Sequence, residues 1–248
     1  MQRIFLILSC SMMTIIYTKE PFIIAHRGAS GYEPENTLRS FKRALQMGAN
    51  MIELDVYQCK SGQVVVIHDS TIDRTTNGSG SVKDLTFAQL QKYDAGKGER
   101  IPLLSQVFDL VNNQIPIMIE LKEANAAKPV AHLIEQYVHD KKWPYDSFIV
   151  TSFDHYAIKE LKKINPHIKT GVIFEGMPIG LAQIATRAGA QHAILYFDSV
   201  TPAFIKDAHK RKVKLFSYTV NNKPLAQKLI EQGVDGIITN YPDILSKS

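Results

Sequence analysis

Three acidic residues occupy places in short apolar runs where their side chains can meet. Glu53 and Asp55 lie two residues apart in the run MIELDVY, and Glu120 lies in the similar run IMIELK. Residues two apart on a strand point to one face, so Glu53 and Asp55 share a face. Neighbouring carboxylates repel each other without a counter-charge. Three carboxylates without a thiolate favour a hard cation, so we predict one divalent ion there, Mg²⁺ or Ca²⁺, with Mn²⁺ as a further candidate.

Two histidines and two basic residues end runs of the same kind. His26 and Arg27 end the first run. His68 ends a later one, and Lys122 ends the run that holds Glu120. Imidazole titrates near neutral pH, so one histidine can act as a base and the other as an acid. Arginine and lysine donate to phosphate oxygens, and together with a hard metal this set indicates phosphoryl transfer. A single acid here would be better explained by a solvated strand end paired with Arg27 or Lys122, whereas three acids on inward positions of neighbouring strands favour the metal site.

These side chains need a scaffold, and the sequence indicates one by alternating short apolar runs with amphipathic segments. The runs are rich in β-branched or aromatic residues, which is typical of strands buried on both faces. We predict strands at Phe22–Ala25, Met51–Val56, Ile117–Leu121, Phe148–Thr151, Thr170–Phe174, Ala193–Phe197, Val213–Tyr218 and Gly236–Thr239. We predict helices at Leu38–Met47, Leu104–Val111, Val130–His139, Tyr156–Ile164, Pro202–Arg211 and Leu225–Gln232, the last ended by Gly233. This alternation predicts an α/β chain, with a closed (β/α)₈ TIM barrel over residues 20–248 and a doubly wound open sheet as the competing fold.

One stretch interrupts the alternation after the second strand. Lys60-Ser61-Gly62 predicts a hairpin turn, and Val64–Ile67 predicts a strand that returns antiparallel. Residues 69–100, rich in Gly, Asn, Thr and Ser, then form a small insertion. In a barrel this insertion lies beyond the C-terminal end of the second strand, on the face where inserted loops usually cover a pocket.

Charge and cysteine content narrow the classes of partner. The 248 residues include 29 basic and 24 acidic side chains, a formal net charge of +5. This mild excess fits a small anionic substrate and a nucleic acid equally well. Because no basic stretch is interleaved with aromatic residues, we predict no nucleic-acid partner. Cys10 and Cys59 provide neither a disulfide framework nor a CxxC metal pattern.

Residues 1–19 differ in composition from the rest of the chain. Arg3 precedes an apolar run that is shorter than a membrane-spanning helix requires. The pattern is typical of a signal peptide, although no A-x-A cleavage site follows. A start assigned too early is the alternative, because a start at Met12 or Met13 removes most of the run. We predict export or membrane association through residues 1–19 rather than a cytoplasmic location.

A series of motifs, in order along the chain, resembles the glycerophosphodiester phosphodiesterase family. The motifs are HRGASGYEPENTLRSF, MIELDVYQCKSGQVVVIHD, DRTTNGSG, IPLLSQVFDLV, IMIELK, VTSF, SYTVNN and GVDGIITNYPDIL. They extend from about residue 22 to residue 245, and the chain is similar to the compact bacterial members. The resemblance implies a (β/α)₈ barrel, a divalent metal, and hydrolysis of glycerophosphodiesters such as glycerophosphocholine or glycerophosphoethanolamine to sn-glycerol 3-phosphate and an alcohol.

The resemblance also implies which residues carry the chemistry. It places the metal ligands at Glu53, Asp55 and Glu120 and the catalytic histidines at His26 and His68. It leaves open whether water attacks the phosphorus directly or the glycerol 2-hydroxyl attacks first to give a cyclic phosphate.

Three further residues are implied as binding residues. Arg27 and Lys122 fall where the family contacts phosphate. Glu35 falls at a site-lining position, where it contacts metal or substrate or only braces Arg27. For the next two residues, Asn36 and Thr37, a helix N-cap is the favoured interpretation over a catalytic role.

Two departures from the family pattern leave other functions open. Tyr218 stands where tryptophan is commoner, and Asn240 stands where aspartate is commoner, so the alcohol side of the pocket differs from the family pattern. With the apolar leader, this keeps a lysophospholipid- or phosphoinositide-directed phosphodiesterase as the alternative function. A non-catalytic phosphate-binding protein on the same scaffold is the remote alternative.

Overall fold

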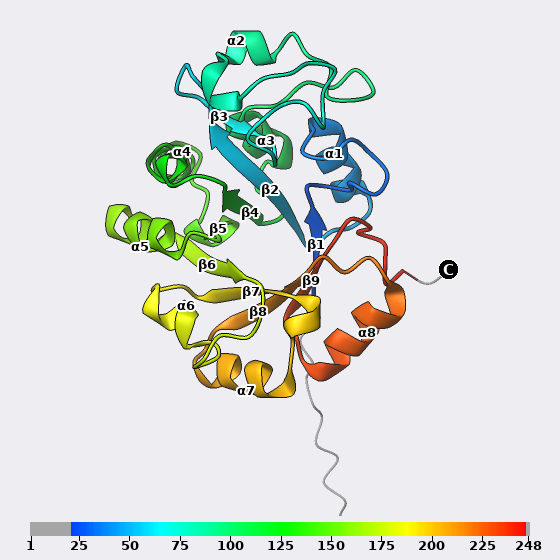
Figure 1. The fold of residues 1–248 in the computed structure, drawn as a ribbon, viewed down its shortest axis with the longest axis vertical. Coiled ribbons are helices and arrows are strands. Elements are labelled where there is room, and N and C mark those ends of the chain that lie inside the picture. The colour runs from blue at the N-terminus through cyan, green and yellow to red at the C-terminus, as the bar shows by residue number, and fades with distance from the viewer. Residues whose placement is uncertain (1–20, 247–248) are drawn as a thin grey trace, which may run out of the picture.

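Eight parallel strands close into a barrel in the computed structural model, which describes residues 21–246 (Figure 1). In order of pairing around the barrel they are β1 (Phe22–His26), β2 (Met51–Gln58), β4 (Ile117–Leu121), β5 (Phe148–Ser152), β6 (Lys169–Phe174), β7 (His192–Tyr196), β8 (Lys214–Tyr218) and β9 (Gly236–Thr239). Strand β1 pairs in parallel with both β2 and β9, which closes the barrel. The predicted TIM barrel is confirmed, and the doubly wound open sheet is excluded.

Helices surround this barrel on the outside, apart from the short helix α2 (Phe87–Leu90), which lies away from it (Figure 1). The others are α1 (Leu38–Gln46), α3 (Leu104–Val111), α4 (Ala127–Asp140), α5 (His155–Ile164), α6 (Gln183–Arg187), α7 (Pro202–Lys210) and α8 (Lys223–Gln232). Single 3₁₀ turns are η1 (Val82–Asp84), η2 (Ala124–Ala126), η3 (Tyr145–Ser147) and η4 (Phe197–Ser199). Each predicted strand and helix is present, and the sequence analysis missed the two shortest helices, α2 and α6, which have too few residues to show a helical period.

Apolar side chains from all eight parallel strands fill the inside of the barrel. They are Ile24, Met51, Met118, Ile149, Ile173, Ile194, Phe216 and Ile238. The alternate residues Ile52 and Leu54 belong instead to the cluster that packs against the helices. The predicted alternation on the second strand is therefore confirmed, and it directs Glu53 and Asp55 to the same side as Met51.

The start of α1 follows directly from its sequence. Thr37 is the N-cap: its Oγ1 accepts a hydrogen bond from the Ser40 N–H, and Ser40 Oγ accepts one from the Thr37 N–H. This reciprocal capping box satisfies two amides that the helix itself cannot pair. It fixes the point at which the loop after β1 enters the helix.

The stretch after β2 turns back as predicted. Strand β3 (Val64–Val66) pairs antiparallel with β2, with Gln58 opposite Val64. The following residues carry η1 and α2 and enclose a separate apolar cluster around Ile72, Leu90 and Ile101. Figure 1 shows this segment beyond β3, at the edge of the barrel nearest to α1 and α3.

The leader predicted at residues 1–19 lies outside the described residues. Within residues 21–246, no helix has both the length and the apolar character needed to cross a membrane.

His192 is a titratable side chain enclosed in the barrel. Only 3% of the residue is exposed, and its ring stacks on Phe216 with 5.3 Å between ring centroids. Its Nδ1 donates a hydrogen bond to the Thr170 carbonyl over 3.2 Å. Burial lowers the pKa of His192 to about 4, so the folded protein holds it neutral at pH values where the unfolded chain takes up a proton.

The burial of His192 predicts a loss of stability in mild acid. Between the unfolded pKa near 6.5 and the folded pKa of about 4, the unfolded chain binds more protons, so the free energy of unfolding falls as the pH falls. The whole shift corresponds to about 3 kcal/mol. Urea unfolding near pH 7 and near pH 5 is expected to show a smaller acid-induced loss for His192→Gln than for the unsubstituted protein. Equal losses would contradict this role of His192.

Candidate active site

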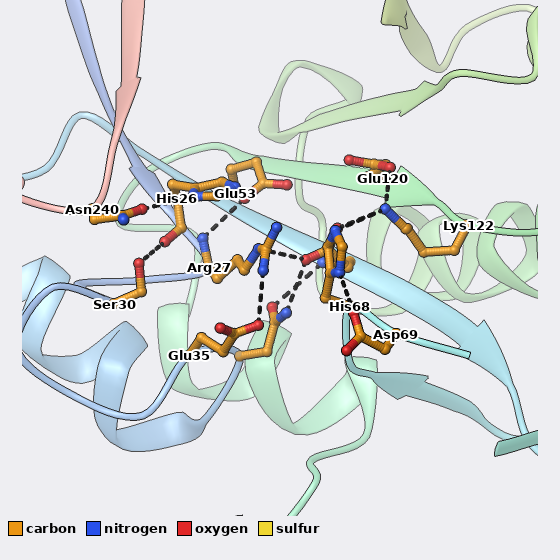
Figure 2. A network of polar contacts seen from close by, with 12 residues as sticks. His26, Arg27, Ser30, Glu35, Glu53, His68, Asp69, Glu120, Lys122 and Asn240 are labelled. Atoms are coloured by element: carbon orange, nitrogen blue, oxygen red, sulfur yellow. Dashed lines mark hydrogen bonds and ion pairs between the residues drawn. The ribbon is translucent and has the colours of Figure 1, made fainter. Parts of the chain in front are cut away.

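The three predicted ligand carboxylates form one cluster at the C-terminal end of the barrel. Figure 2 shows two of them, Glu53 and Glu120, among the polar residues of this region. Glu53 and Asp55 lie on β2, Glu120 lies on β4, and the parallel register pairs Asp55 with Glu120. One oxygen from each carboxylate lies within 4.8 Å of the others. The exposed fraction is 4% for Glu53, 1% for Asp55 and 9% for Glu120. The carboxylates therefore form one buried cluster and are not solvated strand ends.

Asp55 receives most of the neighbouring positive charge. Arg27 Nε lies 3.3 Å from its Oδ2, and Lys122 Nζ lies 3.6 Å from its Oδ1. The Asn36 side-chain amide donates a hydrogen bond to Oδ2 over 2.9 Å. Of the two residues interpreted as an N-cap, Thr37 alone caps the helix, whereas Asn36 turns back to hold Asp55.

Glu53 and Glu120 are less well neutralised. Glu53 accepts the Arg27 backbone N–H at 2.9 Å, and Glu120 accepts Lys122 Nζ at 2.7 Å. Burial raises the pKa of Glu53 well above its usual value, and repulsion from Asp55 adds to this. The same two causes raise the pKa of Glu120 to about 7. A divalent cation would relieve this excess of buried negative charge, so the cluster fits such an ion by charge as well as by its oxygen donors.

His26 ends β1 and is held by a residue from the other end of the chain. Its Nδ1 donates a hydrogen bond to Asn240 Oδ1 over 2.7 Å. Asn240 directly follows β9, and from the sequence it could be recognised only as a departure from the family pattern. This bond leaves Nε2 as the nitrogen that can exchange a proton with a ligand. Burial, with a smaller contribution from Arg27, lowers the pKa of His26 to about 4, so the ring is neutral near pH 7.

His68 follows β3 and is held in a corresponding way by a charged partner. Its Nδ1 donates to the Asp69 carboxylate over 2.6 Å, and its Nε2 lies 3.2 Å from Lys122 Nζ. Asp69 is itself paired with Arg74 Nε at 2.6 Å. Hydrogen bonds to both ring nitrogens therefore fix the orientation of His68 beside the carboxylate cluster.

Arg27 is clamped from several sides. Its backbone is left-handed, with φ of 54°, and its guanidinium Nη1 donates to Glu35 Oε1 over 2.8 Å. The Glu35 carboxylate also accepts hydrogen bonds from both terminal nitrogens of Arg74. Burial by itself would raise the pKa of Glu35, but the two arginines outweigh it and lower this pKa to about 2. Glu35 therefore stays ionised between two arginines, in the bracing position that the sequence analysis had offered as one alternative.

A pocket of about 200 Å³ contains most of these groups. It is lined by His26, Arg27, Glu53, Met118, Glu120, Lys122, His68, Thr151, Phe153, Ile173, Glu175, Ile194, Tyr218, Thr219 and Ile238. A larger depression of about 500 Å³ lies between β3 and α4, but it holds none of the predicted site residues. The smaller pocket is the candidate active site, because Glu53, Glu120 and both histidines line it.

Gly28 allows the loop after β1 to pass close to α1. Its φ is +80°, and a Cβ at this position would lie 2.7 Å from the Ser40 carbonyl carbon. Ser40 Oγ donates to the Arg27 carbonyl over 2.9 Å, so this close approach also holds the backbone of Arg27. A glycine is required here both by the backbone conformation and by the lack of space.

Substitution of Gly28 is therefore expected to lower the free energy of unfolding by more than the unfavourable backbone conformation alone would. Gly28→Ala should lower the free energy of unfolding by about 2–4 kcal/mol, the sum of a left-handed alanine and an overpacked contact. Gly48→Ala is the matched control, because Gly48 has φ of +78° with no atom within 4 Å of the added Cβ. Urea unfolding measures both variants, and equal losses would show that the contact with Ser40 contributes nothing.

Comparisons with known proteins agree with this geometry. Residues 26–244 match the glycerophosphoryl diester phosphodiesterase family. The chain is 39% identical over 236 residues to a glycerophosphodiester phosphodiesterase of Caldanaerobacter subterraneus subsp. tengcongensis, covering 90% of this chain and 95% of that protein. A glycerophosphodiester phosphodiesterase of Bacillus subtilis is 31% identical over 253 residues, covering 90% of this chain and 85% of that protein.

A solved structure gives the same result for the fold. An Oleispira antarctica phosphodiesterase in complex with the product sn-glycerol-3-phosphate matches with a TM-score of 0.85 and 29% identity, covering 91% of this chain and 96% of that chain. The barrel and the extent of the match agree. This chain belongs to the glycerophosphoryl diester phosphodiesterase family.

Proposed function

We propose that this protein hydrolyses glycerophosphodiesters to sn-glycerol 3-phosphate and an alcohol with the help of one divalent cation. One observation carries the proposal: two histidines, an arginine, a lysine and two carboxylates line one pocket, and these two carboxylates belong to the buried cluster of three. Membership of the family and the likeness to a phosphodiesterase that holds sn-glycerol-3-phosphate support the substrate class. In the net reaction the bond from phosphorus to the alcohol oxygen breaks, water supplies the new oxygen on phosphorus, and a proton passes to the alcohol.

Glu53, Asp55 and Glu120 would hold the cation. A divalent ion bound there supplies positive charge that stabilises the phosphate oxygens as the bond to the alcohol breaks. Asn36 keeps one oxygen of Asp55 in place through its 2.9 Å hydrogen bond. The donors are all carboxylates, which suits Mg²⁺, Ca²⁺ and Mn²⁺ alike.

His26 and His68 move the protons. Asn240 fixes the His26 ring through Nδ1 and leaves its Nε2 for proton transfer. Asp69 fixes the His68 ring through Nδ1, and its Nε2, which accepts from Lys122 Nζ, becomes available once Lys122 binds the substrate phosphate in its place. One histidine removes the proton of the attacking hydroxyl, and the other gives a proton to the leaving alcohol. The attacking hydroxyl belongs either to water or to the glycerol 2-position, and the second route passes through a cyclic phosphate that phosphorus NMR would detect.

Arg27 and Lys122 bind the phosphate. Their positive side chains lie beside the carboxylate cluster and line the same pocket. Arginine offers a planar pair of donors, and lysine offers a point charge, and both match phosphate oxygens. Glu35 acts by holding the Arg27 guanidinium at 2.8 Å, so its role in binding substrate is exerted through Arg27.

The test is release of sn-glycerol 3-phosphate from glycerophosphocholine, followed with a coupled assay in the presence of Mg²⁺, Ca²⁺ or Mn²⁺. Lysophosphatidylcholine micelles serve as the comparison substrate. Activity on soluble glycerophosphocholine supports the proposal. Activity confined to the lysolipid would replace it by a lysophospholipid-directed phosphodiesterase, and activity on neither with any of the metals would overturn the diesterase assignment.

A further inference from the structure

One side of the pocket takes no part in the proposed chemistry. The metal-site carboxylates, both histidines, Arg27 and Lys122 come from β1, β2, β4 and the segment after β3. The order of strands places β6 opposite β1 and β8 opposite β4, while β5 lies next to β4. Tyr218 ends β8, Phe153 directly follows β5 and Glu175 directly follows β6, and all three line the same pocket.

Aromatic rings pack edge to face on this side of the pocket. Phe153 and Tyr218 have ring centroids 6.2 Å apart and an interplanar angle of 87°. Tyr196 continues the arc, with its centroid 5.9 Å from that of Tyr218. Phe153 lines the pocket and remains 48% exposed although it is large and apolar.

Glu175 adds a negative charge to this side of the pocket. It directly follows β6 and is exposed. Within residues 21–246 it has no hydrogen bond or ion pair, whereas each of the carboxylates around Arg27, His68 and Lys122 is bonded to a neighbour. After burial, Glu175 is the next largest cause of the raised pKa of Tyr218, as its position near that ring requires.

We propose that Phe153, Tyr218 and Glu175 form a subsite for a positively charged alcohol group, such as a quaternary or primary ammonium, at the far end of the substrate. An ammonium group is attracted to the face of an aromatic ring, and a carboxylate adds a direct charge interaction. A zwitterionic diester would then place its phosphate among Arg27 and Lys122 and its cation across the barrel beside Glu175. This inference rests on the proposed diesterase function and specifies its substrate class.

The subsite is tested with two substrates of the same shape. Glycerophosphocholine carries a trimethylammonium group, and its uncharged analogue carries a tert-butyl group in the same place. The unsubstituted protein is expected to favour the charged substrate in kcat/KM by about tenfold, the factor given by one good cation–π and carboxylate contact. The preference should weaken as salt is added, because Glu175 is exposed to solvent.

Variants locate the source of this preference. Glu175→Gln is expected to reduce the ratio of the two kcat/KM values by about fivefold, as an exposed ion pair of this kind allows. Phe153→Leu should reduce the same ratio while retaining an apolar side chain. Glu231→Gln on α8, an exposed glutamate away from the pocket, is the matched control and should leave the ratio unchanged.

The outcomes separate this inference from the function on which it rests. If both substrates are hydrolysed equally well, or if Glu175→Gln lowers both kcat/KM values by the same factor, the cation subsite is wrong and the diesterase function stands. An equal fall in both kcat/KM values would show that Glu175 contacts a group that both substrates carry, such as the glycerol hydroxyls. If neither substrate releases sn-glycerol 3-phosphate, the proposed function itself fails.

Discussion

Replacement of His26 by alanine is expected to lower kcat for glycerophosphodiester hydrolysis by about three orders of magnitude, the usual contribution of one positioned acid or base. His26 lines the pocket, and its ring is neutral near pH 7 because burial lowers its pKa to about 4. KM should change little because phosphate binding is assigned to Arg27 and Lys122. Release of sn-glycerol 3-phosphate under saturating substrate measures the effect.

Two controls make the His26 result specific. His139→Ala removes a histidine whose side chain is 86% exposed on α4, and it should retain full activity. Asn240→Ala removes the acceptor that holds His26 Nδ1, and it should lower kcat by about 10- to 100-fold. This loss is smaller than the one expected when the ring itself is removed. A His26→Ala variant with nearly full kcat would remove His26 from the mechanism.

Glu53→Gln is expected to separate metal binding from folding. The change keeps the size of the side chain but removes one of three carboxylates, so we expect the metal affinity to fall and the activity at limiting metal to drop by about a hundredfold. In the metal-free protein the same change should raise the free energy of unfolding. Burial and the Asp55 charge raise the pKa of Glu53, because both make its ionised form unfavourable in the folded chain. A neutral glutamine at this position avoids that loss of stability.

Thermal unfolding with and without metal tests both expectations for Glu53→Gln, the weaker metal binding and the higher stability of the metal-free protein. A cation at a hundred times its dissociation constant should stabilise the unsubstituted protein by about 2.7 kcal/mol. Glu53→Gln should unfold at a higher temperature than the unsubstituted protein in chelator and gain much less from added metal. Glu160→Gln, an exposed glutamate on α5 that pairs with Lys163, is the control and should behave like the unsubstituted protein. A Glu53→Gln variant that gains as much from the metal as the unsubstituted protein would show that Glu53 is not a ligand.

The barrel could be predicted because its buried strands have a simple sequence pattern. Ile117–Leu121 and Gly236–Thr239 were predicted with the bounds that the structure gives them, since apolar runs bounded by turn residues mark such strands clearly. The pairing of β1 with β9 could not be read from periodicity, because an open sheet has strands of the same pattern. Closure is a property of tertiary pairing, and the family resemblance supplied it before the structure did.

The acidic cluster could also be predicted, because its geometry is local to two strands. The two-residue spacing of Glu53 and Asp55 fixes a common face, and the parallel pairing of β2 with β4 adds Glu120 at the level of Asp55. No long-range detail was needed beyond the adjacency of two strands.

The residues that orient the site were harder to find. Asn240 is 214 positions from His26, and Arg74 is 39 positions from Glu35, so only the folded chain brings these partners together. Weak signals existed: Asn240 directly follows the last strand, at the catalytic end of the barrel. Asn36 was missed for a different reason, since an amide before a helix is most simply interpreted as a cap.

The central claim is that this cluster at the end of the barrel hydrolyses glycerophosphodiesters only with a divalent cation in place. The most direct measurement is release of sn-glycerol 3-phosphate from glycerophosphocholine by chelator-treated protein, before and after addition of Mg²⁺, Ca²⁺ or Mn²⁺. We predict no release without metal and restored release with at least one of the three ions. Full activity in the metal-free protein, or no activity with any of the ions, would contradict the account.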